Sequence, residues 1–132
     1  MPGLFGLDPE LEFAVSEYDF AKDGGAIGDI TLRGSVIPKG AVIRDSFLFV
    51  ETALTSDGLA TIALKSEGAE DILAADAVAN FSASAVLQGV PDWATVADAV
   101  VTTDDRSIVM SIATAALKTG KFRVYTSFVI GK

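Results

Sequence analysis

The sequence contains no cysteine and no histidine. Without cysteine the chain cannot form a disulfide, a thiol nucleophile or a zinc-thiolate site. Without histidine it lacks the most common general base near neutral pH, a common transition-metal ligand and the usual pH switch. These absences remove many of the side chains on which catalysis depends, so we expect no enzymatic activity.

Long apolar runs are also missing. Half of the residues are hydrophobic, which excludes a disordered chain, but the longest apolar run is far shorter than the ~20 residues that cross a bilayer. The first residues, MPGLFGLDPELEF, carry acidic side chains early and place no basic segment before an apolar stretch. We therefore expect a soluble chain without a secretory signal, whose mature form begins near Met1.

Positive charge is scarce. Ten Lys and Arg residues stand against 18 Asp and Glu residues, which gives a formal net charge of −8. Contacts with phosphate groups need clustered Lys and Arg side chains, and the basic residues of this chain are dispersed. Nucleic acids and anionic membranes are therefore disfavoured as partners.

The sequence does contain many segments in which every second side chain is apolar, the period of a β-strand. The clearest pair, residues 106–114 and 121–130, lies at the end of the chain and is separated by the segment AALKTG. We predict that the pair forms a β-hairpin covering a core. Its inward side chains are expected to be Ile108, Met110 and Ile112, and Phe122, Val124, Phe128 and Ile130.

Turn residues divide the rest of the chain into similar short strands. Residues 70–79 are rich in alanine and fit an irregular strand pair, which we favour, or one short helix. The turn signal Asp57-Gly58 predicts a hairpin between the strands on either side of it. The further predicted strands are 11–18, with Leu11, Phe13 and Val15 on one face; 26–33; 41–54, with Ile43, Phe47 and Phe49 on one face; 59–65; 81–87; and 97–103.

About eight strands and little helix favour an all-β fold, a jelly-roll-like or Greek-key antiparallel β-sandwich. An up-and-down barrel has a similar pattern and stays open as an alternative. The length of 132 residues fits a single core. We divide the chain into an irregular N-terminal arm at 1–10, where proline and glycine break any period, and one sandwich domain over 11–132.

Three segments invite a chemical interpretation. Asp104 and Asp105 are candidate calcium ligands, and Glu67, Glu70 and Asp71 offer carboxylates for glycoside hydrolysis. Adjacent acids in a polar loop are more often a solvated turn, which we favour in both cases. The glycine-rich segment 24–28 lacks the lysine and hydroxyl of a phosphate-binding loop. We predict no catalytic residue, no cofactor and no metal ion.

Apolar side chains outside the expected core indicate association instead. Tyr125 and Val129 lie on the opposite face of their strand from Phe122 and Phe128, so either a second sheet or another chain covers them. Trp93, in the loop GVPDW, is either an interface anchor or a cap on the core. The residues Leu4, Phe5 and Leu7 are expected to pack on their own domain or on a neighbour.

Several turn and strand segments also resemble those of a known family. They are DGGAIG at 23–28, VIPKGAVI at 36–43, TIAL at 61–64, EGAEDI at 67–72, and Ala115, Leu117, Thr119, Gly120, Lys121 and Phe122 before the last strand. In these segments the chain resembles small proteins encoded among the head genes of tailed bacteriophages, the capsid auxiliary proteins of the decoration or cement kind.

The resemblance implies a virion protein that is made in the host cytoplasm and binds the outside of an assembled capsid. It implies a homotrimer at local threefold positions that clamps neighbouring copies of the major capsid protein. Leu4, Phe5 and Leu7 would then supply an apolar arm. The alternative interpretation is a receptor- or glycan-binding β-sandwich of a phage fibre, in which Trp93 would stack on a sugar.

Overall fold

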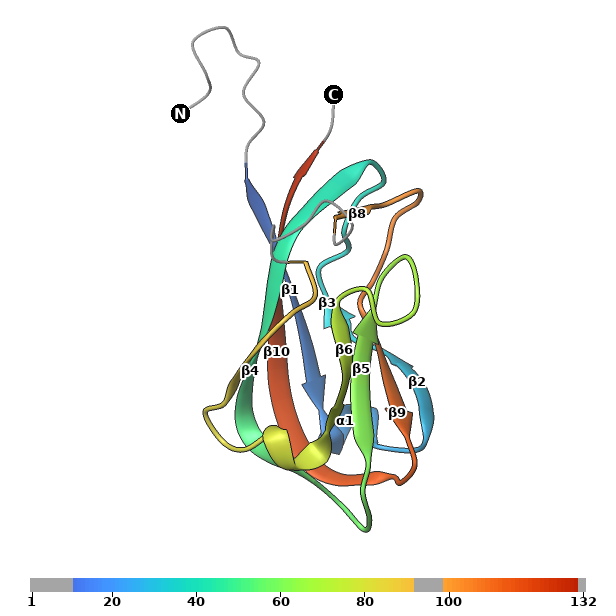
Figure 1. Ribbon diagram of the computed structural model, residues 1–132, viewed down its shortest axis with the longest axis vertical. Helices are drawn as coiled ribbons and strands as arrows, with labels where there is room; N and C mark the ends of the chain where they lie inside the picture. Colours follow the sequence, from blue (N-terminus) through green and yellow to red (C-terminus); the bar gives the residue numbers. More distant parts are fainter. Residues whose placement is uncertain (1–10, 92–98, 131–132) are drawn as a thin grey trace, which may run out of the picture.

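A computed structural model describes residues 11–91 and 99–130, and it arranges them as two antiparallel sheets packed face to face (Figure 1). This confirms the predicted antiparallel β-sandwich. Two short helices accompany the strands: α1 (Phe20–Asp23) and the 3₁₀ helix η1 (Val78–Asn80). The strands are β1 (Glu12–Asp19), β2 (Gly28–Thr31), β3 (Arg33–Gly34), β4 (Ala41–Ser56), β5 (Thr61–Lys65), β6 (Leu73–Ala77), β7 (Val86–Gln88), β8 (Val100–Val101), β9 (Val109–Ala113) and β10 (Leu117–Ile130).

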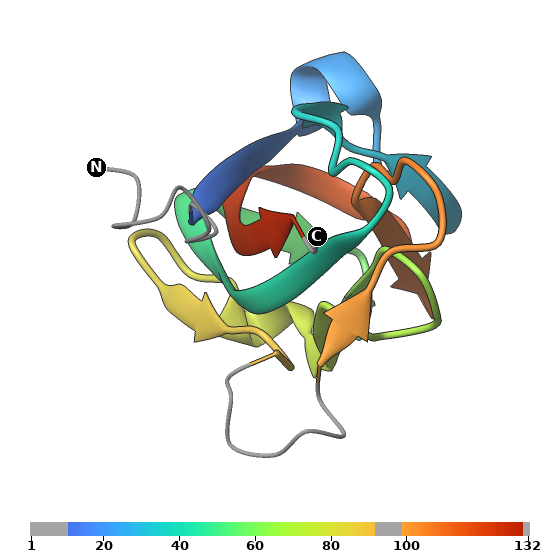
Figure 2. The ribbon, with the colours of Figure 1, turned by 90° about the horizontal axis from the view of Figure 1, so that it is seen from above.

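The strand order identifies the sandwich as a jelly roll. One sheet has six strands in the order β3-β1-β10-β4-β7, with β8 also paired to β4, and the other has four in the order β2-β9-β5-β6. The pairs are nested, because β1 pairs with β10, β2 with β9, β4 with β7 and β8, and β5 with β6. A long ribbon wound around one core produces this nesting. Seen from above, the two sheets enclose that core (Figure 2).

Neither predicted hairpin exists. Strand β9 lies in the four-stranded sheet and β10 in the six-stranded sheet, and β4 and β5 are separated in the same way. The amide of Leu117 donates to the carbonyl of Gly25, 2.8 Å away, rather than to β9. Period-two alternation indicates which side of a strand faces the core. It does not indicate which sheet the strand joins, because both sheets of a sandwich face the same core. Each turn therefore carries the chain from one sheet to the other.

The predicted inward faces of the last two strands are largely correct. Ile108, Met110 and Ile112 are buried on the four-stranded side, opposite buried Phe122, Val124 and Phe128 on β10, while Ile130 is only half-buried. Phe122 also meets Tyr18 of β1, with ring centroids 5.2 Å apart. Burial of these side chains provides the main driving force for joining the two sheets.

A bulge in β4 reverses which side chains face the core. Ile43 pairs with Phe128, but Asp45 pairs with Ser127, so Arg44 is an extra residue in the ladder. Ile43 is therefore buried, whereas Phe47 and Phe49 point outward. The expectation that these three residues share a face was wrong, because a bulge shifts the alternation by one residue.

Strand β1 presents its larger apolar residues outward. Ala14, Ser16 and Tyr18 are buried, whereas Phe13 and Val15 are exposed. Ala14 pairs with Thr126 of β10, and Thr126 pairs with Ser46 of β4, so small side chains form one inward row. Backbone from a crossing loop fits against this row, because the Ser46 hydroxyl donates to the Ile72 carbonyl at 3.2 Å.

The remaining predicted strands are shorter than expected or divided. Residues 26–33 split between β2 and β3, which belong to different sheets, with buried Leu32 between them. Residues 70–79 form β6 followed by η1, so neither the strand pair nor the single helix is correct. Residues 81–85 form no strand, and Phe81 fills the core instead. No helix among residues 11–91 and 99–130 has the length and apolar character needed to cross a bilayer.

Candidate interaction surface

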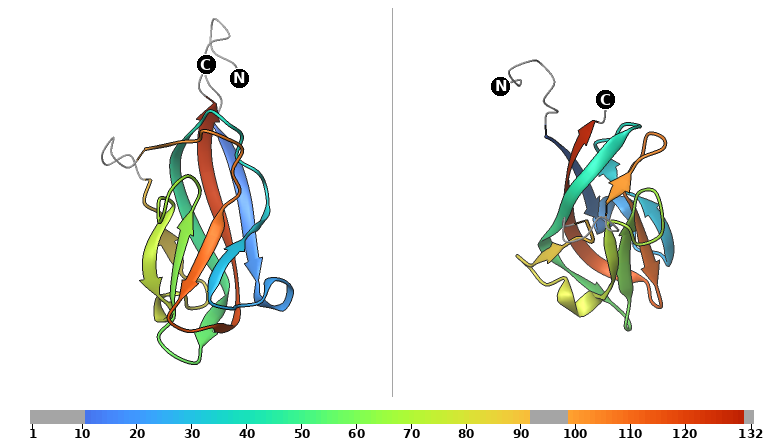
Figure 3. Two further views of the ribbon diagram at one scale, coloured as in Figure 1. Left: turned by 90° about the vertical axis from the view of Figure 1, so that its right-hand side faces the viewer. Right: turned by 45° about the horizontal axis from the view of Figure 1, so that its top comes forward.

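The outer side of the six-stranded sheet carries a cluster of large apolar side chains, which we call the apolar face. It comes from four neighbouring strands, β1, β10, β4 and β7, which lie together on one side of the sandwich (Figure 3). The apolar face consists of Phe13, Val15, Phe47, Phe49, Val86 and Tyr125.

Strand register brings these side chains next to one another. Val15 lies opposite Tyr125, which lies opposite Phe47, and in the neighbouring row Phe49 lies opposite Val86. Side chains that are directly opposite on one face of a sheet are in contact range. The rings of Phe47 and Tyr125 stack with centroids 5.0 Å apart and an interplanar angle of 20°.

Much of this apolar surface is open to solvent. Phe13 is 61% exposed, Val86 64% and Phe47 37%. Among the described residues nine large apolar side chains are exposed; five lie on strands of the six-stranded sheet and none on a strand of the four-stranded sheet. A contiguous exposed apolar patch on a soluble domain marks an interaction site, whereas scattered single residues do not.

Ion pairs border the apolar face where β1 nears its end. Arg123 lies 2.9 Å from Glu51, and Arg33 lies 2.7 Å from Glu17. Arg33 also binds Asp23 at 2.9 Å. Burial raises the pKa of Asp23, but hydrogen bonds from Arg33 and the Asp19 amide, together with the positive charges of Arg33 and Lys22, leave that pKa below its ordinary value. An apolar centre with a charged rim is the usual anatomy of a protein interface.

The outer side of the four-stranded sheet is different in kind. Apart from half-buried Val109, its outward residues are small or polar, and they surround a hollow of about 230 Å³. The charged groups beside the hollow already have partners: Lys65 Nζ lies 2.8 Å from Asp29, and Glu70 accepts from the Ala75 amide at 2.6 Å. The Asp29 carboxylate also accepts from Ser111, so these charged groups have their partners within the chain.

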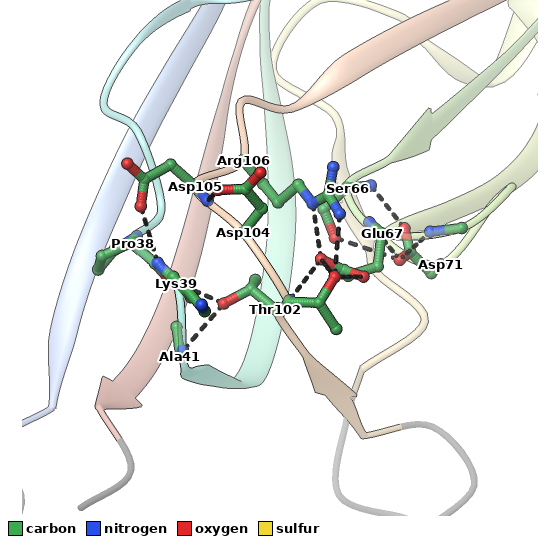
Figure 4. A network of polar contacts seen from close by, with 12 residues as sticks. Pro38, Lys39, Ala41, Ser66, Glu67, Asp71, Thr102, Asp104, Asp105 and Arg106 are labelled. Atoms are coloured by element: carbon green, nitrogen blue, oxygen red, sulfur yellow. Dashed lines mark hydrogen bonds and ion pairs between the residues drawn. The ribbon is translucent and has the colours of Figure 1, made fainter.

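The acidic segments singled out from the sequence hold loops together. Figure 4 shows that residues 38–41, 66–71 and 102–106 meet in one polar network. The Asp71 carboxylate accepts from the amides of Ser66, Glu67 and Gly68 at 2.7 to 2.9 Å. Asp105 accepts from the Lys39 amide at 2.9 Å.

Glu67 is the link between two of these loops. Its Oε1 lies 2.6 Å from Arg106 Nε and accepts from the Thr103 amide at 2.7 Å. The hydrogen bond from Arg106 holds the pKa of Glu67 below its ordinary value, and the Thr103 amide acts in the same direction. No group of three or more acidic residues within the described ranges is arranged to hold a metal ion.

Of the predicted interface residues, two fall within the described ranges. Tyr125 lies in the apolar face, and Val129 lies on the same side of β10, opposite Val42 of β4. Both are half-buried. Leu4, Phe5, Leu7 and Trp93 lie outside the described residues.

Sequence reasoning missed the other residues of the apolar face. Phe47 and Phe49 were expected to share a face with Ile43, and Phe13 and Val15 stood out only as the more apolar side of their strand. The signal for them is that segments 41–54 and 121–130 carry large apolar residues on both faces. An ordinary two-layer sandwich needs only one such face.

The fold also occurs in solved phage capsids. A chain of the cyanophage Pam1 capsid asymmetric unit has a TM-score of 0.64 and 20% identity, over 99% of this chain and 91% of that chain. A chain of the acidic stable capsid structure of Helicobacter pylori bacteriophage KHP30 has a TM-score of 0.60 and 15% identity, over 92% and 89%. A chain of the capsid of Ralstonia phage GP4 has a TM-score of 0.58 and 18% identity, over 96% and 86%.

No family model and no curated protein matches the sequence. At identities of 15 to 20%, the likeness to the capsid chains is one of fold, and it extends over nearly the whole length of both chains in each case. The protein is thus a jelly-roll domain with the same fold as chains of three phage capsids.

Proposed function

We propose that this protein is a structural component of a phage virion that binds the outer surface of the capsid and clamps neighbouring capsid subunits as a homotrimer. The observation that carries the proposal is the apolar face, which one sheet of the sandwich leaves uncovered among the described residues. The likeness in fold to chains of three phage capsids supports the same conclusion.

The composition of the apolar face suits a protein partner. Phe47 and Tyr125 form a stacked pair near its middle, and aromatic side chains are enriched at the centres of protein interfaces. Their mutual stacking restricts their motion before binding, so less side-chain entropy is lost on docking. A capsid subunit that covers this pair would remove both rings from water.

A trimer would make weak contacts sufficient. A capsid surface presents the same site repeatedly, so three linked copies bind with an effective concentration that a single copy lacks. The net charge of −8 keeps the free protein soluble and complements a basic patch on the partner. The proposed partner is the major capsid protein.

The remaining predicted interface residues belong to the same proposal. Leu4, Phe5 and Leu7 would form an apolar arm that contacts the capsid or a neighbouring copy, and Trp93 would add a contact from its loop. A variant that lacks residues 1–10 tests the arm. If that variant bound capsids as tightly as the full chain, the arm would have no part in decoration.

Sedimentation with empty capsids tests the function itself. The probe is a capsid assembled from the major capsid protein of the same phage genome, mixed with purified protein and recovered by centrifugation. We expect saturable co-sedimentation and a raised temperature of capsid disruption, because a clamp that binds only the intact shell stabilises it by mass action. Absence of this protein from the capsid fraction at all concentrations would contradict the proposal.

A further inference from the structure

One edge of the six-stranded sheet is open for half of its length. Strand β1 pairs with β10 from Glu12 to Asp19, but on its other side β3 pairs only with Ser16 and Glu17. Within the described ranges no strand lies beyond β1 at residues 12–15. This open segment belongs to the strand that supplies Phe13 and Val15 to the apolar face.

Every second residue of the open segment directs its backbone polar groups away from the sheet. The Val15 carbonyl accepts from the Ser35 amide at 3.0 Å, so the polar groups of Val15 face away from β10. In an antiparallel ladder the amide and carbonyl of one residue point to the same side, and that side alternates along the strand. The amide and carbonyl of Phe13 therefore face the open edge too, ready to pair with another strand.

Other edges of the two sheets are shortened or occupied, but this one is not. Strands β3, β7 and β8 have only two or three residues, and β2 begins with a glycine at positive φ followed by an aspartate. On the remaining edge strand, β6, the Ala75 amide already donates to the Glu70 carboxylate at 2.6 Å. Natural proteins shorten, charge or cover an edge to prevent pairing with other chains. The segment Glu12-Phe13-Ala14-Val15 has no lysine, proline or bulge and exposes two large apolar side chains.

The ten residues that precede Leu11 are long enough to reach such an edge on another molecule. In an extended conformation they span roughly 33 Å, and their sequence includes Leu4, Phe5 and Leu7. We propose that residues 1–10 of a second copy of this chain add along the open edge of β1 and cover Phe13 and Val15. This inference rests on the proposed trimer and identifies the contact that joins its subunits.

The turn chemistry favours a second copy over the same chain. If Phe5 paired with Phe13 of its own chain, the shortest loop between the two paired segments would be residues 8–10. Pro9 would then occupy the third position of a type I turn. Proline is disfavoured there, and the residue before a proline is held in an extended conformation. Asp8 and Pro9 thus favour a chain that continues past the end of β1 instead of reversing.

Exchange of this kind is compatible with the proposed threefold symmetry. Each copy gives its N-terminal segment to one neighbour and receives a segment from the other, which is a head-to-tail contact that forms a ring. Strand addition to an exposed sheet edge is a common mode of peptide recognition. The arrangement would leave Phe47, Phe49 and Val86 available for the capsid.

Cysteine cross-linking tests the exchange directly, because the natural chain contains no cysteine. The variant carries Phe5→Cys and Phe13→Cys and is treated with a short bismaleimide. The matched control carries Phe5→Cys and Leu59→Cys, and Leu59 is 84% exposed. Leu59 follows the end of β4 that pairs with Leu117, whereas β1 begins beside Phe128, at the other end of β10. Products are separated on a denaturing gel and identified by mass spectrometry.

We expect covalent dimers and trimers from the test pair and mainly monomers from the control. A test pair that links only within one chain would overturn the inference in favour of the same chain covering its own edge. A test pair that links no better than the control would overturn it as well. Capsid sedimentation of the natural protein reports separately, so capsid binding by the natural protein without linkage in the test pair rejects the exchange and leaves the proposed function intact.

Discussion

The two outer sides of the sandwich have the same backbone periodicity but different side chains. On the six-stranded sheet, outward positions hold Phe13, Phe47 and Val86, all of them exposed. On the four-stranded sheet, outward Lys65 and Ser111 both bind the carboxylate of Asp29. A sheet side that satisfies its own polar groups can face water. Covering an apolar sheet side with another surface lowers the free energy, because it removes apolar side chains from water. The contrast therefore explains why we propose the six-stranded side as the one that binds a partner.

Charge placed on the apolar face gives the largest expected effect. The double variant Phe47→Glu and Val86→Glu should reduce capsid binding by about 100-fold or more, because docking would bury two unpaired carboxylates. The matched control, Ala75→Glu and Ala113→Glu, adds the same charge to exposed positions of the four-stranded sheet. Sedimentation should show the control binding like the natural protein. Equal losses in both variants would mean that net charge, not location, governs binding.

Adjacent residues of β4 separate stability from binding. Leu48 is buried in the core and Phe47 is part of the apolar face. Leu48→Ala should lower the free energy of unfolding by about 2 to 5 kcal/mol, the range for a large cavity in a packed core. Phe47→Ala should lower it by less than about 1 kcal/mol, since surface changes have small effects. Urea unfolding followed by circular dichroism measures both, and a reversed order would contradict the assignment of the two faces.

The contribution of the polar network to stability should depend on pH. The pKa of Glu67 is lowered by its hydrogen bond with Arg106, so its contribution to stability is complete above the ordinary pKa of 4.5. That contribution is lost as the pH falls through the lowered value in the folded state. The melting temperature should therefore drop from pH 7 to acidic pH more in the natural protein than in Glu67→Gln. Identical pH profiles would show that Glu67 does not stabilise these loops.

A buried hydroxyl on the inner side of the six-stranded sheet gives the smallest effect. Thr126 is fully buried, and its Oγ1 has no hydrogen-bond partner among the residues described. Thr126→Val should raise the free energy of unfolding by about 1 kcal/mol, because it removes an unsatisfied polar group while keeping the shape. The control Ser46→Ala should lower stability, because it removes the bond to the Ile72 carbonyl. Thermal unfolding distinguishes the two signs.

Alternation predicted the fold class and most of the core. The inward assignment of Ile108, Met110 and Phe122 was correct because a strand over a core must bury every second side chain. The partner of each strand was not predictable in the same way. Asp57-Gly58 is a favourable turn both for a hairpin and for a crossing between sheets, so local sequence did not distinguish the two.

Much of the candidate surface was missed for a similar reason. A single extra residue at Arg44 reverses the facing of Phe47 and Phe49, and sequence gives no sign of where a bulge will occur. On β1, the inward side holds Ala14 and Ser16 because a crossing loop occupies the space beside their row. The outward facing of Tyr125 was predicted correctly, since it lies opposite in phase to Phe122 and Phe128 on an unbroken strand.

Light scattering across a dilution series of the purified protein determines whether this jelly roll self-associates, as the proposed assembly role requires. We expect a stable species of three times the 13.7 kDa chain mass that persists on dilution and is lost when residues 1–10 are removed. A protein that stays monomeric at every concentration, with the apolar face open to solvent, would exclude the proposed trimer.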